Sequence, residues 1–159
     1  HTTFCDGRDT PEQLVQEAIR LGCPALGFSG HSYAFYDAAC MPKENIRPYQ
    51  AEIRRLQSAY SGQIQILLGI EQEYYSDEPT EAYDYVIGAV HNLRHGSEYR
   101  SVDHTRERLI AIVDDWFGGD WYAMVEEYYR LVGDRSARRR RGCCSAACRR
   151  ASRRRRCRR

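Results

Sequence analysis

Long apolar runs are missing from this sequence, and cysteines are few before residue 134. No apolar run approaches the ~20 residues that a membrane-spanning helix needs, and no segment resembles a secretory signal peptide. Before residue 134 the only cysteines are Cys5, Cys23 and Cys40, which are more typical of small buried side chains than of a disulfide framework. We therefore expect a reduced, cytoplasmic protein with no membrane partner.

Acidic residues are absent from the last part of the chain. Residues 135–159 hold 13 of the 24 basic residues and none of the 22 acidic ones. Residues 1–134 therefore carry 11 basic against 22 acidic residues, a formal charge of −11. An acidic body argues against non-specific nucleic-acid binding by the folded part, and it is compatible with a site that concentrates divalent cations.

Residues 135–159 also lack aromatic residues and strand-forming runs, so we expect them to form a disordered tail after a single domain at residues 1–134. An arginine-rich tail can bind nucleic acid non-specifically through phosphates. We favour instead a shift of reading frame in GC-rich coding sequence, because the composition changes abruptly. Cys143, Cys144 and Cys148 lack the paired spacing of a zinc ribbon, and we expect no zinc site there.

The first regular element is predicted directly by its start signal. Thr10 precedes Pro11, and Gln13 lies three residues after Thr10, which is the pattern of a capped helix start. An apolar stripe follows, and Gly22 is expected to end this helix of about three turns.

The next segments alternate between strand and helix patterns. The expected elements are a strand at residues 25–29, a helix at 46–60, a strand at 63–70 and a strand at 83–90. Pro48 is tolerable only near the first turn of its helix. This alternation is typical of a parallel α/β sheet.

The remaining part of residues 1–134 is expected to be mainly helical. Residues 96–102 are expected to form a loop or a short extended piece, and residues 109–117 a helix that stops at Gly118. Asp120 is expected to cap another helix. Its inward-facing residues are expected to be Trp121, Met124, Val125, Tyr128 and Val132.

Potential metal ligands stand in equivalent places after the three expected strands. His31 follows the first strand, Glu71 the second, and His91 the third. The carboxyl ends of parallel strands lie side by side, at the edge where active sites occur. His1 and Asp6 precede the first helix and would, by the same logic, follow a strand before residue 1. Five nitrogen and oxygen ligands fit Zn, Mn or Fe.

Each residue also has a structural interpretation. His31 is equally compatible with a polar loop residue, Glu71 with a solvated carboxylate, and His91 with a hydrogen-bonded core histidine. Their repeated placement favours the metal site over these alternatives. His95 and His104 follow no expected strand end, and we interpret both as surface residues. Cys5 lies between His1 and Asp6, and we expect it to serve packing.

Five ordered motifs give the chain a family resemblance. They are residues 1–7, 27–32, 68–72 and 85–91, and the Phe-Gly-Gly-Asp of 117–120 followed by Glu-Glu-Tyr-Tyr-Arg at 126–130. Over about residues 1–133 the chain resembles histidinol-phosphate phosphatases of the PHP (polymerase and histidinol phosphatase) superfamily. The resemblance implies an α/β fold, a distorted (β/α)7 barrel, and hydrolysis of L-histidinol phosphate in histidine biosynthesis.

The resemblance also implies a trinuclear Zn, Mn or Fe centre with the ligands His1, Asp6, His31, Glu71 and His91. Glu71 would bridge two ions, and Glu71 and His91 would be the catalytic pair. No substrate-binding residue is assigned. By the same comparison, the first strand and the carboxyl-terminal half of the barrel are expected to be missing, so we expect this chain to be weakly active or inactive.

Two alternatives remain open. Another PHP phosphoesterase or nuclease would use nearly the same ligands. A nucleic-acid-binding protein with an arginine-rich tail would use residues 135–159 instead.

Overall fold

The computed structural model describes the backbone of residues 1–142 and the side chains of residues 1–134. The chain forms two compact units, of which the first is His1–Ala89 and the second begins at Val90. The expectations for residues 143–159 lie outside the described residues.

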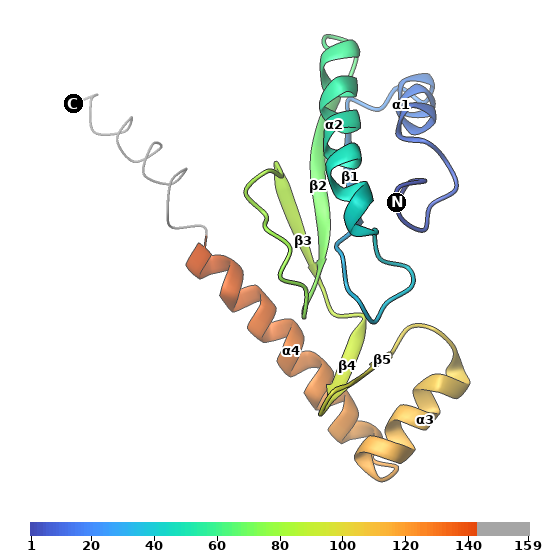
Figure 1. Ribbon diagram of the computed structural model, residues 1–159, viewed down its shortest axis with the longest axis vertical. Helices are drawn as coiled ribbons and strands as arrows, with labels where there is room; N and C mark the ends of the chain where they lie inside the picture. Colours follow the sequence, from blue (N-terminus) through green and yellow to red (C-terminus); the bar gives the residue numbers. More distant parts are fainter. Residues whose placement is uncertain (143–159) are drawn as a thin grey trace, which may run out of the picture. The chain divides into compact units, whose positions relative to one another are not determined.

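The first unit contains a three-stranded parallel sheet in the order β1-β2-β3 (Figure 1). Its elements are α1 (Pro11–Arg20), β1 (Ala25–His31), α2 (Lys43–Ala59), β2 (Gln65–Glu73) and β3 (Tyr85–Ala89). The predicted alternation of helix and strand and the parallel pairing are both confirmed.

The helix start predicted at Thr10 is present. The Thr10 side chain accepts a hydrogen bond from the backbone N–H of Gln13, and the Gln13 side chain accepts one from the N–H of Thr10. These two bonds satisfy amides that have no partner within the helix. The second helix begins earlier than expected, at Lys43, so Pro48 lies inside it rather than in its first turn.

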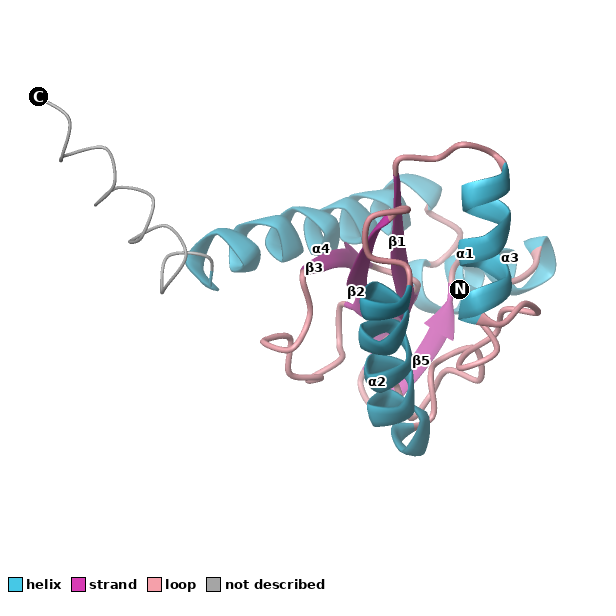
Figure 2. Ribbon diagram, turned by 90° about the horizontal axis from the view of Figure 1, so that it is seen from above, coloured by secondary structure: helices cyan, strands magenta, loops and turns pink. Residues whose placement is uncertain are grey.

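The carboxyl edge of the sheet carries two of the predicted site residues, His31 and Glu71. β1 and β2 extend further than their apolar runs, because pairing continues to His31, which is opposite Glu71. The two helices α1 and α2 pack on the sheet (Figure 2). The side chains of the main core are Val15, Ala18, Phe28, Met41, Tyr49, Ile53, Leu56, Ile64, Ile66, Leu68, Ile70 and Tyr83.

The second unit begins with an antiparallel hairpin that the sequence patterns indicate poorly. Its described elements are β4 (Asn92–His95), β5 (Glu98–Ser101), α3 (Arg106–Phe117) and α4 (Trp121–Gly142). β4 was not predicted, and β5 is the short extended piece that was expected, as an alternative to a loop, at residues 96–102. Each strand has only four residues, which is too short for a period to be read. Gly96 has a φ of 60° and makes the turn between them.

The helices of the second unit begin and end near the expected residues. Gly118, with a φ of 58°, ends α3 in the left-handed conformation, and Asp120 accepts hydrogen bonds from the backbone of Tyr122 and Ala123. The expected inward face of α4 is wrong at two positions, since Trp121 is 46% exposed and Val125 41% exposed. Helical periodicity alone does not show which side of a helix has a neighbour.

The boundary of the expected tail differs from the structure. α4 continues through residues 135–142, which we expected to be disordered. Alanine and arginine both have high helix propensity, so the composition of this stretch favours a helix that has already begun. No helix of the described residues is long and apolar enough to cross a membrane.

Candidate metal centre

The first seven residues fold into a closed loop that presents His1 and Asp6 side by side. The carbonyl oxygen of Thr2 accepts hydrogen bonds from the N–H groups of Cys5 and Gly7, each at 3.0 Å. A side chain at position 7 would not fit, because a Cβ on Gly7 would lie 2.4 Å from the Thr2 nitrogen and 2.6 Å from the His1 carbonyl carbon. Gly7 therefore allows the close approach that brings His1 and Asp6 together.

The loop is held against the rest of the first unit. Asn45 on α2 donates a side-chain hydrogen bond of 3.0 Å to the carbonyl oxygen of Phe4. The Phe4 ring packs edge-on against Tyr49, with 5.9 Å between the ring centroids. Thr2 is 1% exposed. These contacts fix the loop beside the end of β1 and explain how residues before the first helix take part in the site.

His31 and Glu71 reach the site from the sheet. Each lies near the carboxyl end of its strand, and the parallel register places them opposite each other. Beneath them the buried Tyr49 hydroxyl accepts a hydrogen bond from the Gly30 N–H at 3.3 Å and donates one to the Gly69 carbonyl at 2.8 Å. Burial raises the pKa of Tyr49, so it remains a neutral donor. Tyr49 thus supports both strands just before His31 and Glu71.

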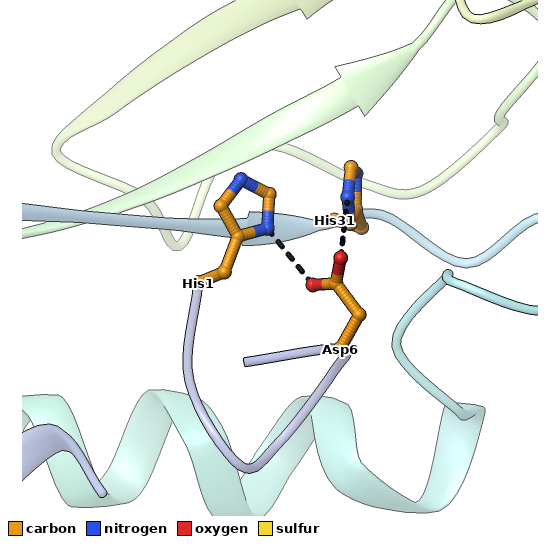
Figure 3. A group of neighbouring side chains, drawn as sticks. All are labelled: His1, Asp6 and His31. Atoms are coloured by element: carbon orange, nitrogen blue, oxygen red, sulfur yellow. Dashed lines mark hydrogen bonds and ion pairs between the residues drawn. The ribbon is translucent and has the colours of Figure 1, made fainter. Parts of the chain in front are cut away.

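Four side chains of the first unit converge on one small volume (Figure 3 shows three of them). His1 Nδ1 lies 3.1 Å from Asp6 Oδ1, and His1 Nε2 lies 3.3 Å from Glu71 Oε2. His31 Nε2 lies 3.6 Å from Asp6 Oδ2, and His31 Nδ1 lies 3.8 Å from Glu71 Oε2. Each ring nitrogen therefore faces a carboxylate oxygen. His31 and Glu71 are the less exposed pair, at 17% and 18%.

The spacing of these atoms fits ligands around a cation. Hydrogen bonds between nitrogen and oxygen are about 2.7–3.2 Å long, so the contact of His1 with Asp6 is a hydrogen bond and the other three contacts are longer. Two ligands of one tetrahedral zinc ion lie roughly 3.3 Å apart, from zinc–ligand distances of about 2.0–2.2 Å. The ligand atoms of His1, Asp6 and His31 all lie within 4.8 Å of one another. The donor set of imidazoles and carboxylates suits Zn, Mn or Fe.

The other candidate residues lie on or next to different elements of the chain. His91 follows β3 at the start of the second unit, where its carbonyl oxygen accepts a hydrogen bond from the Val102 N–H. Its role as a ligand stays a prediction. His95 and His104 are exposed, as expected, although His95 ends β4 and stacks on Trp116. Cys5 Sγ lies 4.0 Å from His1 Nδ1, and Cys5 packs against the core.

Three supporting residues were not predicted as part of the site. They are Gly7, Tyr49 and Ser32. Ser32 is 2% exposed, its N–H donates to the Glu71 carbonyl, and its Oγ accepts from the Glu73 N–H. In the sequence, Gly7 was visible only as part of the Asp-Gly pair, and Ser32 only as the residue directly after His31. The contacts of Tyr49 and Ser32 join segments far apart in the chain, which sequence patterns do not show.

The fold and the site together define an α/β protein with a histidine and carboxylate cluster that could hold a metal ion. The sequence profile of the PHP domain matches residues 1–151. The chain therefore belongs to the PHP domain family. The match extends past residue 134, where we expected the domain to end.

Two curated relatives of the chain have names that include histidinol-phosphatase. The chain is 32% identical over 155 residues to the histidinol-phosphatase of Bacillus subtilis (strain 168), covering 83% of this chain and 56% of that protein. It is 33% identical over 107 residues to the "Probable histidinol-phosphatase" of Deinococcus radiodurans, covering 58% of this chain and 40% of that protein. The chain thus spans about half the length of the curated relatives it matches.

A solved structure supports the fold. The crystal structure of a Listeria monocytogenes protein described as a candidate histidinol phosphatase superposes with a TM-score of 0.59. The match covers 68% of this chain and 49% of that one, at 22% sequence identity. The fold of the matched part of the chain is therefore similar to that of this Listeria protein.

Proposed function

We propose that this chain provides the catalytic face of a metal-dependent phosphomonoester hydrolase, a histidinol-phosphatase that converts L-histidinol phosphate and water to L-histidinol and phosphate in L-histidine biosynthesis. The observation that carries the proposal is the convergence of His1, Asp6, His31 and Glu71 at the carboxyl edge of the parallel sheet. Family membership and the names of the relatives support the choice of substrate.

The proposal also covers ligand roles beyond those of these four residues. His91 would be the fifth ligand, and Glu71 would bridge two ions of a trinuclear centre. The three parallel strands would belong to a distorted (β/α)7 barrel in a cytoplasmic enzyme. The position of Glu71 Oε2, within 3.3 Å of His1 Nε2 and 3.8 Å of His31 Nδ1, supports a bridging role for this carboxylate.

The residues of the chain would act mainly by holding and orienting. Divalent ions, when bound, supply Lewis acidity that polarises a phosphate ester and lowers the pKa of water. Asp6, whose two oxygens face His1 and His31 separately, would share an ion with these imidazoles. Glu71 Oε2 faces the other nitrogen of each ring, and it would take part in the same cluster. Ligands that are already gathered before an ion binds are the preorganisation that catalysis needs.

Phosphate release tests this proposal directly. The chain would be incubated at high concentration with Mn²⁺, Zn²⁺ or Fe²⁺ and L-histidinol phosphate, beside His31→Ala as the matched variant. We expect slow, metal-dependent phosphate release that is lost in the variant. Equal release by both proteins would contradict the proposal. Preferential cleavage of bis(p-nitrophenyl) phosphate would favour a PHP phosphodiesterase or nuclease.

The arginine-rich tail has its own test. Filter binding of the full chain and of residues 1–134 to nucleic acid separates the alternatives. We expect weak, salt-sensitive binding that depends on residues 135–159 and is the same for unrelated sequences.

A further inference from the structure

A cavity of about 530 Å³ lies in the first unit, between the segment after β1, the start of α2 and the segment after β2. Its lining contains Tyr33, Ile46 and Pro79, the cations Lys43 and Arg47, and the carboxylates Glu44, Asp77 and Glu78. None of these residues belongs to the candidate metal centre. The cavity combines an aromatic ring, an aliphatic side chain and carboxylates, which are the groups that hold small organic ligands in place.

The walls of the cavity are connected along the chain to two residues of the candidate metal centre. Tyr33 is two residues beyond His31, a distance of up to about 7 Å in an extended chain. On the other side, Gln72 follows Glu71 directly, and its Nε2 donates a hydrogen bond of 2.8 Å to the Glu78 carbonyl. Both walls of the cavity are therefore continuous with strands that carry ligands.

One hydroxyl fixes the two walls to each other. Ser76 Oγ donates a hydrogen bond of 2.9 Å to the Tyr33 carbonyl, and it accepts one of 3.3 Å from the Glu78 N–H. The aromatic residue and the carboxylate residue are thus held by the same side chain. A cavity built this way is preformed, so a ligand does not have to order it.

The lining is suited to an aromatic group that donates hydrogen bonds or carries positive charge. Lys43 Nζ already lies 4.6 Å from the centre of the Tyr33 ring, so a cation is accommodated against this aromatic face. Asp77 is exposed and Glu78 half-buried. Burial raises the pKa of Glu78, while a hydrogen bond with Tyr83 opposes the rise. A donor from a ligand would stabilise the ionised form of this carboxyl.

We propose that this cavity binds the imidazole ring of the substrate, with Tyr33 in contact with the ring and Asp77 and Glu78 accepting its N–H groups. This inference rests on the proposed function. In L-histidinol phosphate, five bonds of roughly 1.5 Å separate the phosphorus from the ring, a reach of about 6 Å. With the phosphate at the metal centre, the ring would reach about as far as Tyr33, which is up to about 7 Å from His31 along the chain. Asp77 and Glu78 are then specificity-determining residues rather than catalytic ones.

The test measures binding of L-histidinol, which has the ring but no phosphate, to the full chain in buffer with a chelator. L-Leucinol, an amino alcohol without the ring, is the control ligand. We expect L-histidinol to bind more tightly than L-leucinol, and Asp77→Asn and Glu78→Gln each to weaken it roughly tenfold. Glu81→Gln, an exposed residue of the same segment outside the cavity lining, is expected to leave binding unchanged.

A charge change of opposite sign sharpens the test. Lys43→Gln removes the cation beside Tyr33 and is expected to tighten binding. The inference is overturned if L-histidinol does not bind, if both ligands bind equally, or if Lys43→Gln and Asp77→Asn shift affinity in the same direction. The titration needs neither metal nor turnover, so its failure is distinguishable from failure of the phosphatase proposal. Circular dichroism confirms that each variant is folded.

Discussion

His31 and Glu71 are opposite each other in the register of β1 and β2, and His31 Nδ1 lies 3.8 Å from Glu71 Oε2. The pairing is a consequence of strand register, because both residues come at the carboxyl ends of neighbouring parallel strands. The sheet therefore supplies one half of the candidate centre, and the loop of residues 1–7 supplies the other.

Metal content is the first quantity that this arrangement predicts. His31→Ala and Glu71→Gln are each expected to lower the affinity for Zn²⁺ or Mn²⁺ by more than the roughly 10–100-fold typical of changes to residues that only support a ligand. His104→Ala, which removes an exposed histidine, is the control. Metal per chain is measured by mass spectrometry after dialysis. Unchanged stoichiometry in Glu71→Gln would exclude the bridging role.

Gly7 is predicted to control the geometry of the loop. In Gly7→Ala, the new Cβ would meet the backbone of His1 and Thr2, which cannot move without opening the loop. We expect metal affinity to fall while the far-ultraviolet circular dichroism spectrum is kept. Gly133→Ala is the matched control, since no atom lies within 4 Å of its added Cβ. Full metal affinity in Gly7→Ala would show that the close approach is not needed.

Tyr49→Phe is predicted to destabilise the first unit. The change removes the hydroxyl that donates to the Gly69 carbonyl and accepts from the Gly30 N–H, in a fully buried position. Loss of such a buried partner costs about 1–3 kcal/mol of unfolding free energy. Urea unfolding measures it. Tyr122→Phe, at a residue 85% exposed, is expected to have no effect. Equal stability of the two variants would show that the Tyr49 hydroxyl does not stabilise the contact with Gly30 and Gly69.

Asp84 is predicted to make the fold sensitive to acid. Burial alone would raise the pKa of Asp84, but hydrogen bonds from the Leu68 N–H and the Arg54 guanidinium outweigh it and hold the pKa below its ordinary value. Such a group stabilises the fold above its unfolded-state pKa, and the stabilisation is lost as pH falls through the lower folded-state pKa.

The comparison for this prediction is Asp84→Asn. Unfolding free energy measured between pH 6 and pH 3 is expected to fall less steeply in the variant than in the unchanged chain, because asparagine does not titrate. Asp114→Asn, at an exposed residue on α3, is the control and is expected to retain the steeper fall. Parallel curves for Asp84→Asn and the unchanged chain would remove Asp84 as the cause.

The sequence alone determined the local elements and the kinds of residue that we propose as metal ligands. Thr10, Pro11 and Gln13 specify the first helix because their contacts lie within four residues. The apolar runs specify strands, and their alternation with helices specifies parallel pairing. For the same reason, His31 and Glu71 could be placed at one edge before any distance was known. β4 and the exposed side of α4 could not be predicted, because four residues are too few to show a period and helical periodicity does not show which side of a helix has a neighbour.

Only the tertiary structure decided which residues meet. It brings His1 and Asp6 to His31 and Glu71, through a loop closed at Gly7 and held by Asn45. It places Tyr49 under both strands and Ser76 between the two walls of the cavity. These contacts join segments separated by up to about seventy residues. Sequence patterns report on a residue's own turn or strand, and packing alone determines contacts over such separations.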